Sequence, residues 1–195
     1  MTDSKRYPRN VELKNGSVTL DLMQSDMEQE VLSFASTLPP HDLLFLRRDI
    51  TQPKVLSAWG TQIDSGEITS LIAREDGNML GCSAVVVDKH SWSPHVGELR
   101  VLVGPAGKDR GLGRVLIQES FLLALGLGLQ KLTAQMTPDQ TAAIAVFEEM
   151  GFIAEALLKD HVQDQQGTKH DIVILSHDVE AFAAQMEAYG LNDLY

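Results

Sequence analysis

The segment GKDRGLGRVL, residues 107–116, places closely spaced glycines and three basic side chains directly before a helical pattern. Glycine lets a ligand approach the backbone, the first-turn amides of a helix have no intrahelical acceptor, and the helix dipole favours an anion there. Lys108, Arg110 and Arg114 add positive charge to a chain whose formal net charge is −11. The segment therefore predicts a site for a phosphate-bearing ligand. The alternative is a glycine-rich turn with solvated basic side chains.

Two nucleotide-binding motifs do not fit this segment. A Walker A loop requires serine or threonine after its lysine, because the hydroxyl binds magnesium, and Asp109 stands there instead. A dinucleotide fingerprint beginning at Gly111 requires a third glycine where Leu116 stands. The spacing predicts anion binding without naming the ligand.

Two segments together carry a family resemblance. VGPAGKDRGLG (103–113) resembles the V-x-P-x-x-[Q/R]-x-x-G-x-[G/A] signature of the GNAT N-acetyltransferase superfamily, and QTAAIAVFEEMGF (140–152) resembles its N-x-x-A-x-x-L-Y-x-x-x-G-F helix. The resemblance implies one GNAT domain over residues 1–195 and acetyl-CoA as cosubstrate. It also implies an α/β (α+β) fold with a mixed, mostly antiparallel central sheet, flanked by helices and splayed between the fourth and fifth strands.

The resemblance further implies which residues contact acetyl-CoA. They are Val101, Leu102, Val103, Lys108, Asp109, Arg110, Gly111, Leu112, Gly113, Arg114, Gln140 and Phe147. Lys108 replaces the usual glutamine or arginine, Gln140 replaces asparagine, and Phe147 replaces a tyrosine that often protonates the leaving thiolate. Since phenylalanine has no proton to donate, we expect the thiolate to be protonated by solvent, with Tyr189 or Tyr195 as alternative donors.

Family chemistry, in which an amine attacks the thioester directly in a ternary complex, needs a base and an oxyanion donor. Glu98 is the candidate base, because in a strand it shares one face with Arg100, and a carboxylate among apolar neighbours can accept a proton. The alternative is an orienting ion pair with Arg100. His95 is the second choice of base. The amide of Leu102 or Val103 is the candidate oxyanion donor.

The acceptor is expected to be a primary amine of a small molecule or a protein. Arg47 and Arg48 could bind a carboxylate of the acceptor, whereas Asp160, His161 and Asp171 could steer a cationic amine. For both groups the alternative is an ordinary solvated or paired charge. We expect Trp59 and Trp92 to pack, and we expect Cys82 to be an unreactive strand residue.

Hydrophobic periodicity and turn residues predict the elements that position these groups. They are a hairpin over 11–22 turning at Asn15-Gly16, a helix over 25–38 capped by Ser25 or Asp26, a helix after Pro53, strands over 68–75, 79–88 and 97–104, a helix of about 15 residues ended by Gly126 or Gly128, a strand over 131–137, a helix over 140–151 with Gly151 as its cap, strands over 152–162 and 170–179, and a terminal helix over 179–189.

Composition narrows the functional classes. The chain is 44% hydrophobic and 22% charged, has no apolar run near the roughly 20 residues of a membrane span, and begins with a polar segment unlike a secretory signal. A single cysteine fits the cytoplasm. The acidic net charge disfavours nucleic acid, and with it a toxin acting on aminoacyl-tRNA. The six histidines lack metal-ligand spacing.

Two hypotheses remain. The first is a cytoplasmic acetyl-CoA-dependent N-acetyltransferase with an amine-bearing acceptor. The alternative is a non-catalytic acyl-CoA-binding or sensing module, which Phe147 and Gln140 favour. Neither hypothesis involves a membrane, and both are compatible with a homodimer.

Overall fold

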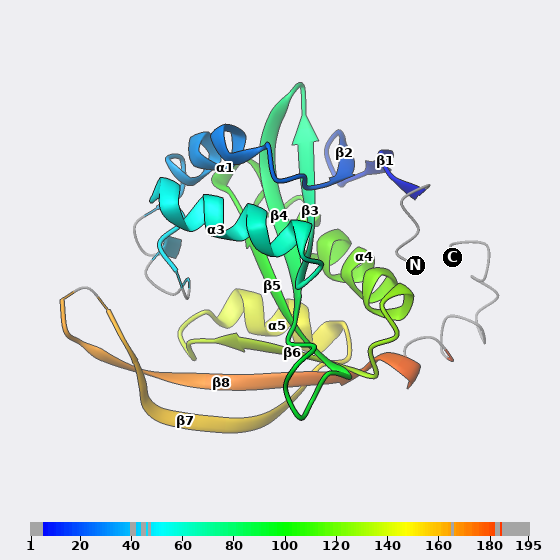
Figure 1. The fold of residues 1–195 in the computed structure, drawn as a ribbon. Coiled ribbons are helices and arrows are strands. Elements are labelled where there is room, and N and C mark those ends of the chain that lie inside the picture. The colour runs from blue at the N-terminus through cyan, green and yellow to red at the C-terminus, as the bar shows by residue number, and fades with distance from the viewer. Residues whose placement is uncertain are drawn as a thin grey trace.

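A computed structural model describes residues 6–39, 42–43, 46, 48–164, 166–181 and 184. Within them, eight strands form one sheet in the order β1-β2-β3-β4-β5-β6-β8-β7 (Figure 1). The strands are Arg9–Glu12 (β1), Ser17–Leu22 (β2), Ile68–Glu75 (β3), Asn78–Val87 (β4), Val96–Val103 (β5), Lys131–Met136 (β6), Ile153–Gln163 (β7) and Lys169–Asp178 (β8). Neighbouring strands are antiparallel except for the parallel pair β5 and β6. The mixed, mostly antiparallel sheet is confirmed.

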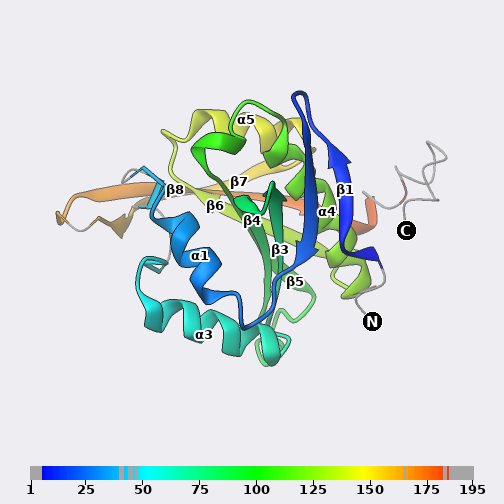
Figure 2. The same ribbon diagram turned by 90° about the horizontal axis from the view of Figure 1, so that it is seen from above.

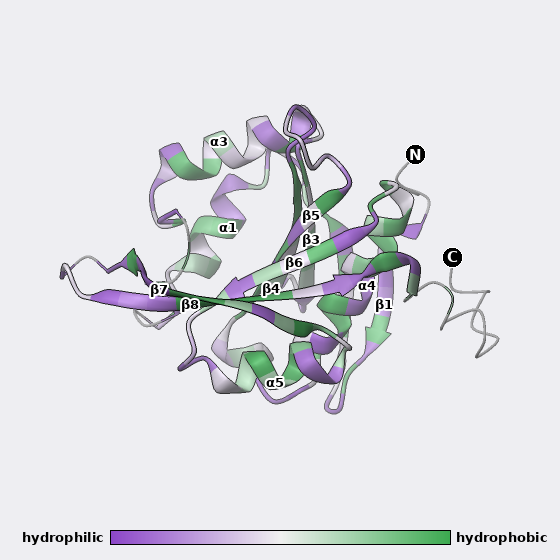
Figure 3. Ribbon diagram, turned by 90° about the horizontal axis from the view of Figure 1, so that it is seen from below, coloured by the Kyte–Doolittle hydropathy of each residue, from purple (hydrophilic) through white to green (hydrophobic). Residues whose placement is uncertain are grey.

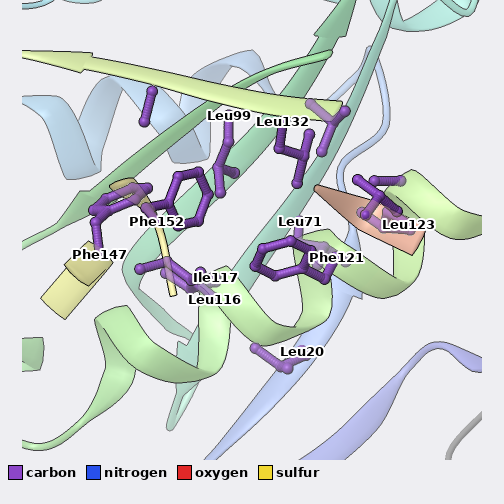
Figure 4. Packing of buried hydrophobic residues seen from close by; sticks show 14 of the residues in the cluster. Leu20, Leu71, Leu99, Leu116, Ile117, Phe121, Leu123, Leu132, Phe147 and Phe152 are labelled. Carbon is purple, nitrogen blue, oxygen red and sulfur yellow. The ribbon is translucent and has the colours of Figure 1, made fainter. Parts of the chain in front are cut away.

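Helices cover both faces of this sheet (Figure 2). They are Glu28–Ala35 (α1), Pro53–Asp64 (α3), Leu112–Gly126 (α4) and Thr141–Glu149 (α5). One hydrophobic core lies under α1 and α3 and includes Phe34, Leu56 and Ile72. The other lies under α4 and α5 and includes Leu116 and Phe121 (Figure 4). Among the described helices, none is long and apolar enough to cross a membrane.

The N-terminal hairpin and the boundary residues test the local predictions. β1 and β2 pair around Gly16, whose φ of 83° lies in the left-handed region that favours glycine. The predicted cap of α1 is wrong, because Ser25 and Asp26 lie in the preceding turn and Met27 is the N-cap, without a side-chain cap bond. The helix therefore begins at Glu28, one or two residues later than the predicted caps imply.

The β7–β8 hairpin forms one edge of the sheet, and its distal part is largely hydrophilic (Figure 3). β7 is exposed along almost its whole length, including Ile153 at 65% and Leu157 at 52%. Helical backbone follows β8 at Val179. Most of the predicted terminal helix over 179–189 lies outside the described residues.

A buried carboxylate joins the N-terminal segment to α4. Glu119 is only 4% exposed, and its Oε2 accepts a hydrogen bond of 2.7 Å from the Tyr7 hydroxyl. Arg9 Nη2 lies 3.0 Å from Oε1, and Arg6 Nε lies 3.5 Å from Oε2. Burial, together with the charge of Glu119, raises the pKa of Tyr7, so Tyr7 remains a neutral donor. Glu119 is therefore compensated by two guanidinium groups and a hydroxyl.

Replacing Glu119 by glutamine should lower the free energy of unfolding by about 2 kcal/mol, because two partly buried guanidinium groups lose their counter-charge. Urea denaturation, compared at equal m-value, measures the change. Glu148→Gln, on the exposed side of α5, is the matched control and should change stability by less than about 0.5 kcal/mol. Equal effects of the two variants would contradict the anchoring role of Glu119.

Candidate functional site

The neighbouring strands β5 and β6 part from each other. β5 pairs with β4 from Gly97 to Val103, but with β6 only from Val96 to Glu98. The last pair of the β5–β6 ladder joins Glu98 and Thr133. The expected splay between the fourth and fifth strands is wrong for this chain, because β4 and β5 pair from Gly81 to Val87. The N-terminal hairpin contributes two strands, and the parting lies between the fifth and sixth.

Beyond Glu98, β5 and β6 leave a gap between their backbones. The register of the β4–β5 ladder determines which backbone N–H groups of β5 face this gap. The Gly104 N–H donates to the Leu80 carbonyl at 2.8 Å, which fixes the alternation of the antiparallel ladder. By that alternation, the backbone N–H of Leu102 is directed to β4. The N–H groups of Val101 and Val103 are directed to the opposite side, where β6 no longer pairs.

The glycine loop, residues 104–113, connects the end of β5 to α4. Gly111 is the N-cap of α4 and has a φ of 87°, a conformation that favours glycine. The Val115 N–H donates to the Gly111 carbonyl at 3.2 Å. The amides of residues 112–114 consequently have no intrahelical acceptor, and they lie at the positive end of the helix dipole.

Packing does not explain the glycine at position 113. A Cβ atom added there would meet no described atom closer than Val103 Cγ2, at 3.8 Å, which is ordinary van der Waals contact. By contrast, a Cβ on Gly107 would come within 2.8 Å of Leu112 Cδ2. Gly107 is thus required by the fold, whereas Gly113 keeps space open at the N-terminus of α4.

Two basic side chains of the loop region form ion pairs within the protein. Lys108 Nζ lies 2.7 Å from Asp42 Oδ2, and Arg114 pairs with Glu149 of α5. Each pair compensates a positive charge that the sequence pattern predicts to face an anionic ligand. The backbone amides and the helix dipole therefore supply a larger part of the positive potential at the loop than expected.

Arg110 joins the glycine loop to other parts of the fold. It forms a bidentate pair with Glu75 at the end of β3, with distances of 2.5 and 2.8 Å, and its Nε donates to the Asn15 carbonyl at 3.0 Å. The Lys14 N–H donates to the Arg110 carbonyl at 3.1 Å. The ion pair lowers the pKa of Glu75, so the carboxylate stays charged at neutral pH. Arg110 thereby fastens the glycine loop to the β1–β2 turn.

The second motif forms α5 and its N-terminal turn. Gln140 is the N-cap, and its Oε1 accepts a hydrogen bond of 3.1 Å from the Thr137 N–H. Phe147 is buried, and its ring meets that of Phe152 edge to face at 4.9 Å (Figure 4). The side chains of Gln140 and Phe147 thus have structural partners, and their coenzyme contacts stay predictions.

A pocket of about 380 Å³ lies between the sheet and α3. Its described lining comes from the segment preceding α3, from α3, and from the strands β3, β4 and β5. Val101 and Leu102, which the resemblance places against acetyl-CoA, belong to this lining. The pocket therefore reaches the stretch of β5 next to the gap.

Glu98 lies beside this pocket and is paired with one of its lining residues. The Arg100 Nε–H donates to Glu98 Oε1 at 2.9 Å. The orienting ion pair, considered above as an alternative, is present in the structure. His95 is exposed in the β4–β5 connection and does not appear among the described lining residues.

The other expected residues divide into packed, exposed and distant groups. Cys82 is buried, and burial raises its pKa to about 12, so it remains a neutral thiol at physiological pH. Trp59 is partly buried, as expected, but the packing role of Trp92 is wrong, since its side chain is 98% exposed in the loop after β4.

The residues expected to steer a cationic amine lie on the β7–β8 hairpin, and none of them belongs to the described pocket lining. The Asp160 N–H donates to Asp171 Oδ1 at 2.9 Å, and His161 is exposed. Arg47, Tyr189 and Tyr195 lie outside the described residues. Within the described part of the chain, no three metal-ligating side chains come together.

Comparison with known proteins identifies the fold. Residues 32–152 match the family described as Acetyltransferase (GNAT) family. The chain belongs to the GNAT acetyltransferase family. A curated relative, "Putative phosphinothricin acetyltransferase YwnH" of Bacillus subtilis (strain 168), is 28% identical over 82 residues. That match covers 42% of this chain and half the length of the relative.

Solved GNAT structures show the same architecture. The acetyltransferase of GNAT family from Streptococcus pneumoniae has a TM-score of 0.70 and 19% identity, covering 83% of this chain and 99% of its own. The yncA protein of Salmonella typhimurium, solved with acetyl-CoA, has a TM-score of 0.71 and 18% identity, covering 83% of this chain and 94% of its own. At these identities the likeness concerns the fold.

The open space at Gly113 generates a test of the loop. Gly113→Val should weaken acetyl-CoA binding about tenfold or more, because a branched side chain enters the space before the helix amides. Gly113→Ala is the matched control, since its Cβ has room, and it should retain binding while stabilising the helix by about 0.5–1 kcal/mol. Calorimetric titration measures both affinities. Unchanged affinity of a folded Gly113→Val protein would remove the loop from the binding site.

Proposed function

We propose that the protein is an acetyl-CoA-dependent N-acetyltransferase acting on a primary amine of a small molecule or a protein. One observation carries this proposal: the pocket and the glycine loop converge on the same end of β5. Val101 and Leu102 line the pocket, and Val103 leads directly into the loop. A donor bound at the loop and an acceptor bound in the pocket would thus meet beside the gap.

Acetyl-CoA binding is assigned to the loop and the strand. The amides of residues 112–114 would hold the pyrophosphate, with Lys108, Asp109, Arg110 and Gly111 shaping the approach. The gap-facing backbone groups of Val101 and Val103 would pair with the pantetheine arm, which satisfies groups that β6 leaves without a ladder partner.

The register also favours one oxyanion donor. Because the Leu102 N–H is directed to β4, the Val103 amide is the better placed of the two expected donors. In the proposed reaction the amine nitrogen attacks the thioester carbonyl carbon, a C–N bond forms and the C–S bond breaks. The amine proton passes to Glu98, directly or through water, and the thiolate takes a proton from solvent.

The family and the relative support this function at different levels of detail. Membership in the GNAT acetyltransferase family supports acyl transfer from acetyl-CoA. The name of the relative YwnH includes phosphinothricin, a small molecule, which favours the small-molecule class of acceptor. We also propose a cytoplasmic location and a homodimer, the latter because the edge strand β7 exposes Ile153 and Leu157.

The non-catalytic alternative is distinguished by turnover. We expect release of free coenzyme A, measured with a thiol reagent, when acetyl-CoA is mixed with the protein and a panel of primary amines. Boiled protein and Gly113→Val are the controls. Tight binding of acetyl-CoA without amine-dependent release from any member of the panel would support the sensing module instead.

A second test addresses Glu98. Glu98→Gln keeps an acceptor for the Arg100 Nε–H and removes the base, so turnover should fall about 100-fold at neutral pH. The loss should shrink as the pH approaches the pKa of the amine, about 8–10, because the amine then loses its proton without help. The pH profile of kcat/KM measures this effect. A loss of equal size at every pH would assign Glu98 to the orientation of Arg100 only.

A further inference from the structure

The proposed acceptor pocket is lined by two arginines and mostly apolar side chains, in an otherwise acidic protein, and one of these arginines, Arg100, is paired with Glu98. Its described lining includes the arginines Arg48 and Arg100 and contains no aspartate or glutamate. The whole chain, by contrast, has 27 acidic residues against 16 lysines and arginines. Most of the remaining lining is aliphatic, including Leu46, Ile50, Val55, Ile68 and Val86.

Other polar side chains of the lining already have partners. The Trp59 Nε1–H donates to Ser70 Oγ at 3.1 Å, and the Gln62 Nε2 group donates to Glu67 Oε2 at 3.2 Å. Ser83 Oγ accepts a bond of 2.9 Å from the Ser120 hydroxyl. Recognition of a polar ligand group therefore falls mainly to the two guanidinium groups.

Arg100 lines the pocket and is held in place by neighbours on the sheet. It lies opposite Ala84 in the β4–β5 ladder, so a small side chain stands beside it. Its bond to Glu98 uses Nε, one of the five N–H donors of a guanidinium group. Among the described contacts, the terminal Nη groups donate to no protein acceptor. Arg48 belongs to the segment that precedes α3 on the same pocket.

We propose that the acceptor is a small amine that also carries a carboxylate and an apolar body, as an aliphatic or aromatic α-amino acid does. The inference rests on the proposed acetyltransferase function and names its substrate class. Arg48 and Arg100 bind the carboxylate, since guanidinium donors match its two oxygens. The aliphatic lining holds the side chain, and the volume lies within the range of small-molecule sites. The sheet end of the pocket, at Val101 and Leu102, receives the amine.

Matched pairs of amines test the carboxylate directly. The probes are L-leucine, L-methionine and L-phenylalanine, each compared with its decarboxylated amine, 3-methylbutylamine, 3-(methylthio)propylamine or 2-phenylethylamine. We expect at least one amino acid to have a kcat/KM about tenfold or more above that of its partner, as the loss of a charged hydrogen bond implies. Preference for the decarboxylated amine in all three pairs would overturn the proposal.

Variants locate the effect in the pocket. Arg48→Gln should raise the KM for the preferred amino acid about tenfold, and should leave the KM for its decarboxylated partner and for acetyl-CoA unchanged. Lys54→Gln, which removes a positive charge from the exposed start of α3, is the matched control and should change none of these constants. An equal effect of Arg48→Gln on both members of a pair would contradict carboxylate recognition.

Failure of the substrate class is separable from failure of the acetyltransferase function. Turnover of amines without a preference for the carboxylate leaves the function standing and removes the substrate class. If no amine is turned over, calorimetric titration of the three amino acids into the protein with saturating coenzyme A still tests the pocket. Saturable binding that Arg48→Gln weakens would support the pocket assignment, and no binding at millimolar concentration would overturn it.

Discussion

The incomplete pairing of β5 is the constraint on which the site depends. This strand is bonded to β4 along nearly its full length, which holds its backbone rigid, but it is joined to β6 at only three positions. A central strand normally has both edges satisfied, and buried backbone groups without partners are costly. The strand thus presents an ordered but unfilled row of donors and acceptors, which suits an extended, amide-containing ligand.

The two faces of the sheet each bring a different structure to the unpaired edge of β5. On one side, α4 and the glycine loop bring helix amides to the end of β5. On the other, α3 and the preceding segment leave a pocket against β4 and β5. The alternation of a strand sends Arg100 and Leu102 to the pocket and Leu99 to the α4 core. A single strand can therefore serve a donor and an acceptor without either ligand entering a hydrophobic core.

Local patterns predicted most of the fold and the position of the loop. Turn residues and hydrophobic periodicity are local properties of the sequence. They determine the hairpin turning at Gly16, the helix beginning at Pro53 and the strands around the loop. The ion partners of Lys108, Arg110 and Arg114 could not be predicted in this way, because the chain brings them from distant elements. The exposure of Trp92 was missed for the same reason, since burial is decided by tertiary packing. The pocket proposed to bind a carboxylate had only the arginines before α3 as a sequence signal.

The bonds between the glycine loop and the β1–β2 turn bear on how the protein folds. The Arg110 side chain meets a carbonyl 95 residues earlier in the chain, and this turn lies outside the stretch matched by the family. A contact of such sequence separation has an entropic cost of closure, which the packing of the surrounding sheet must offset. The shape of the loop in the folded protein thus depends on a contact between distant parts of the chain. The N-terminal hairpin therefore braces the loop from outside the stretch that the family model matches.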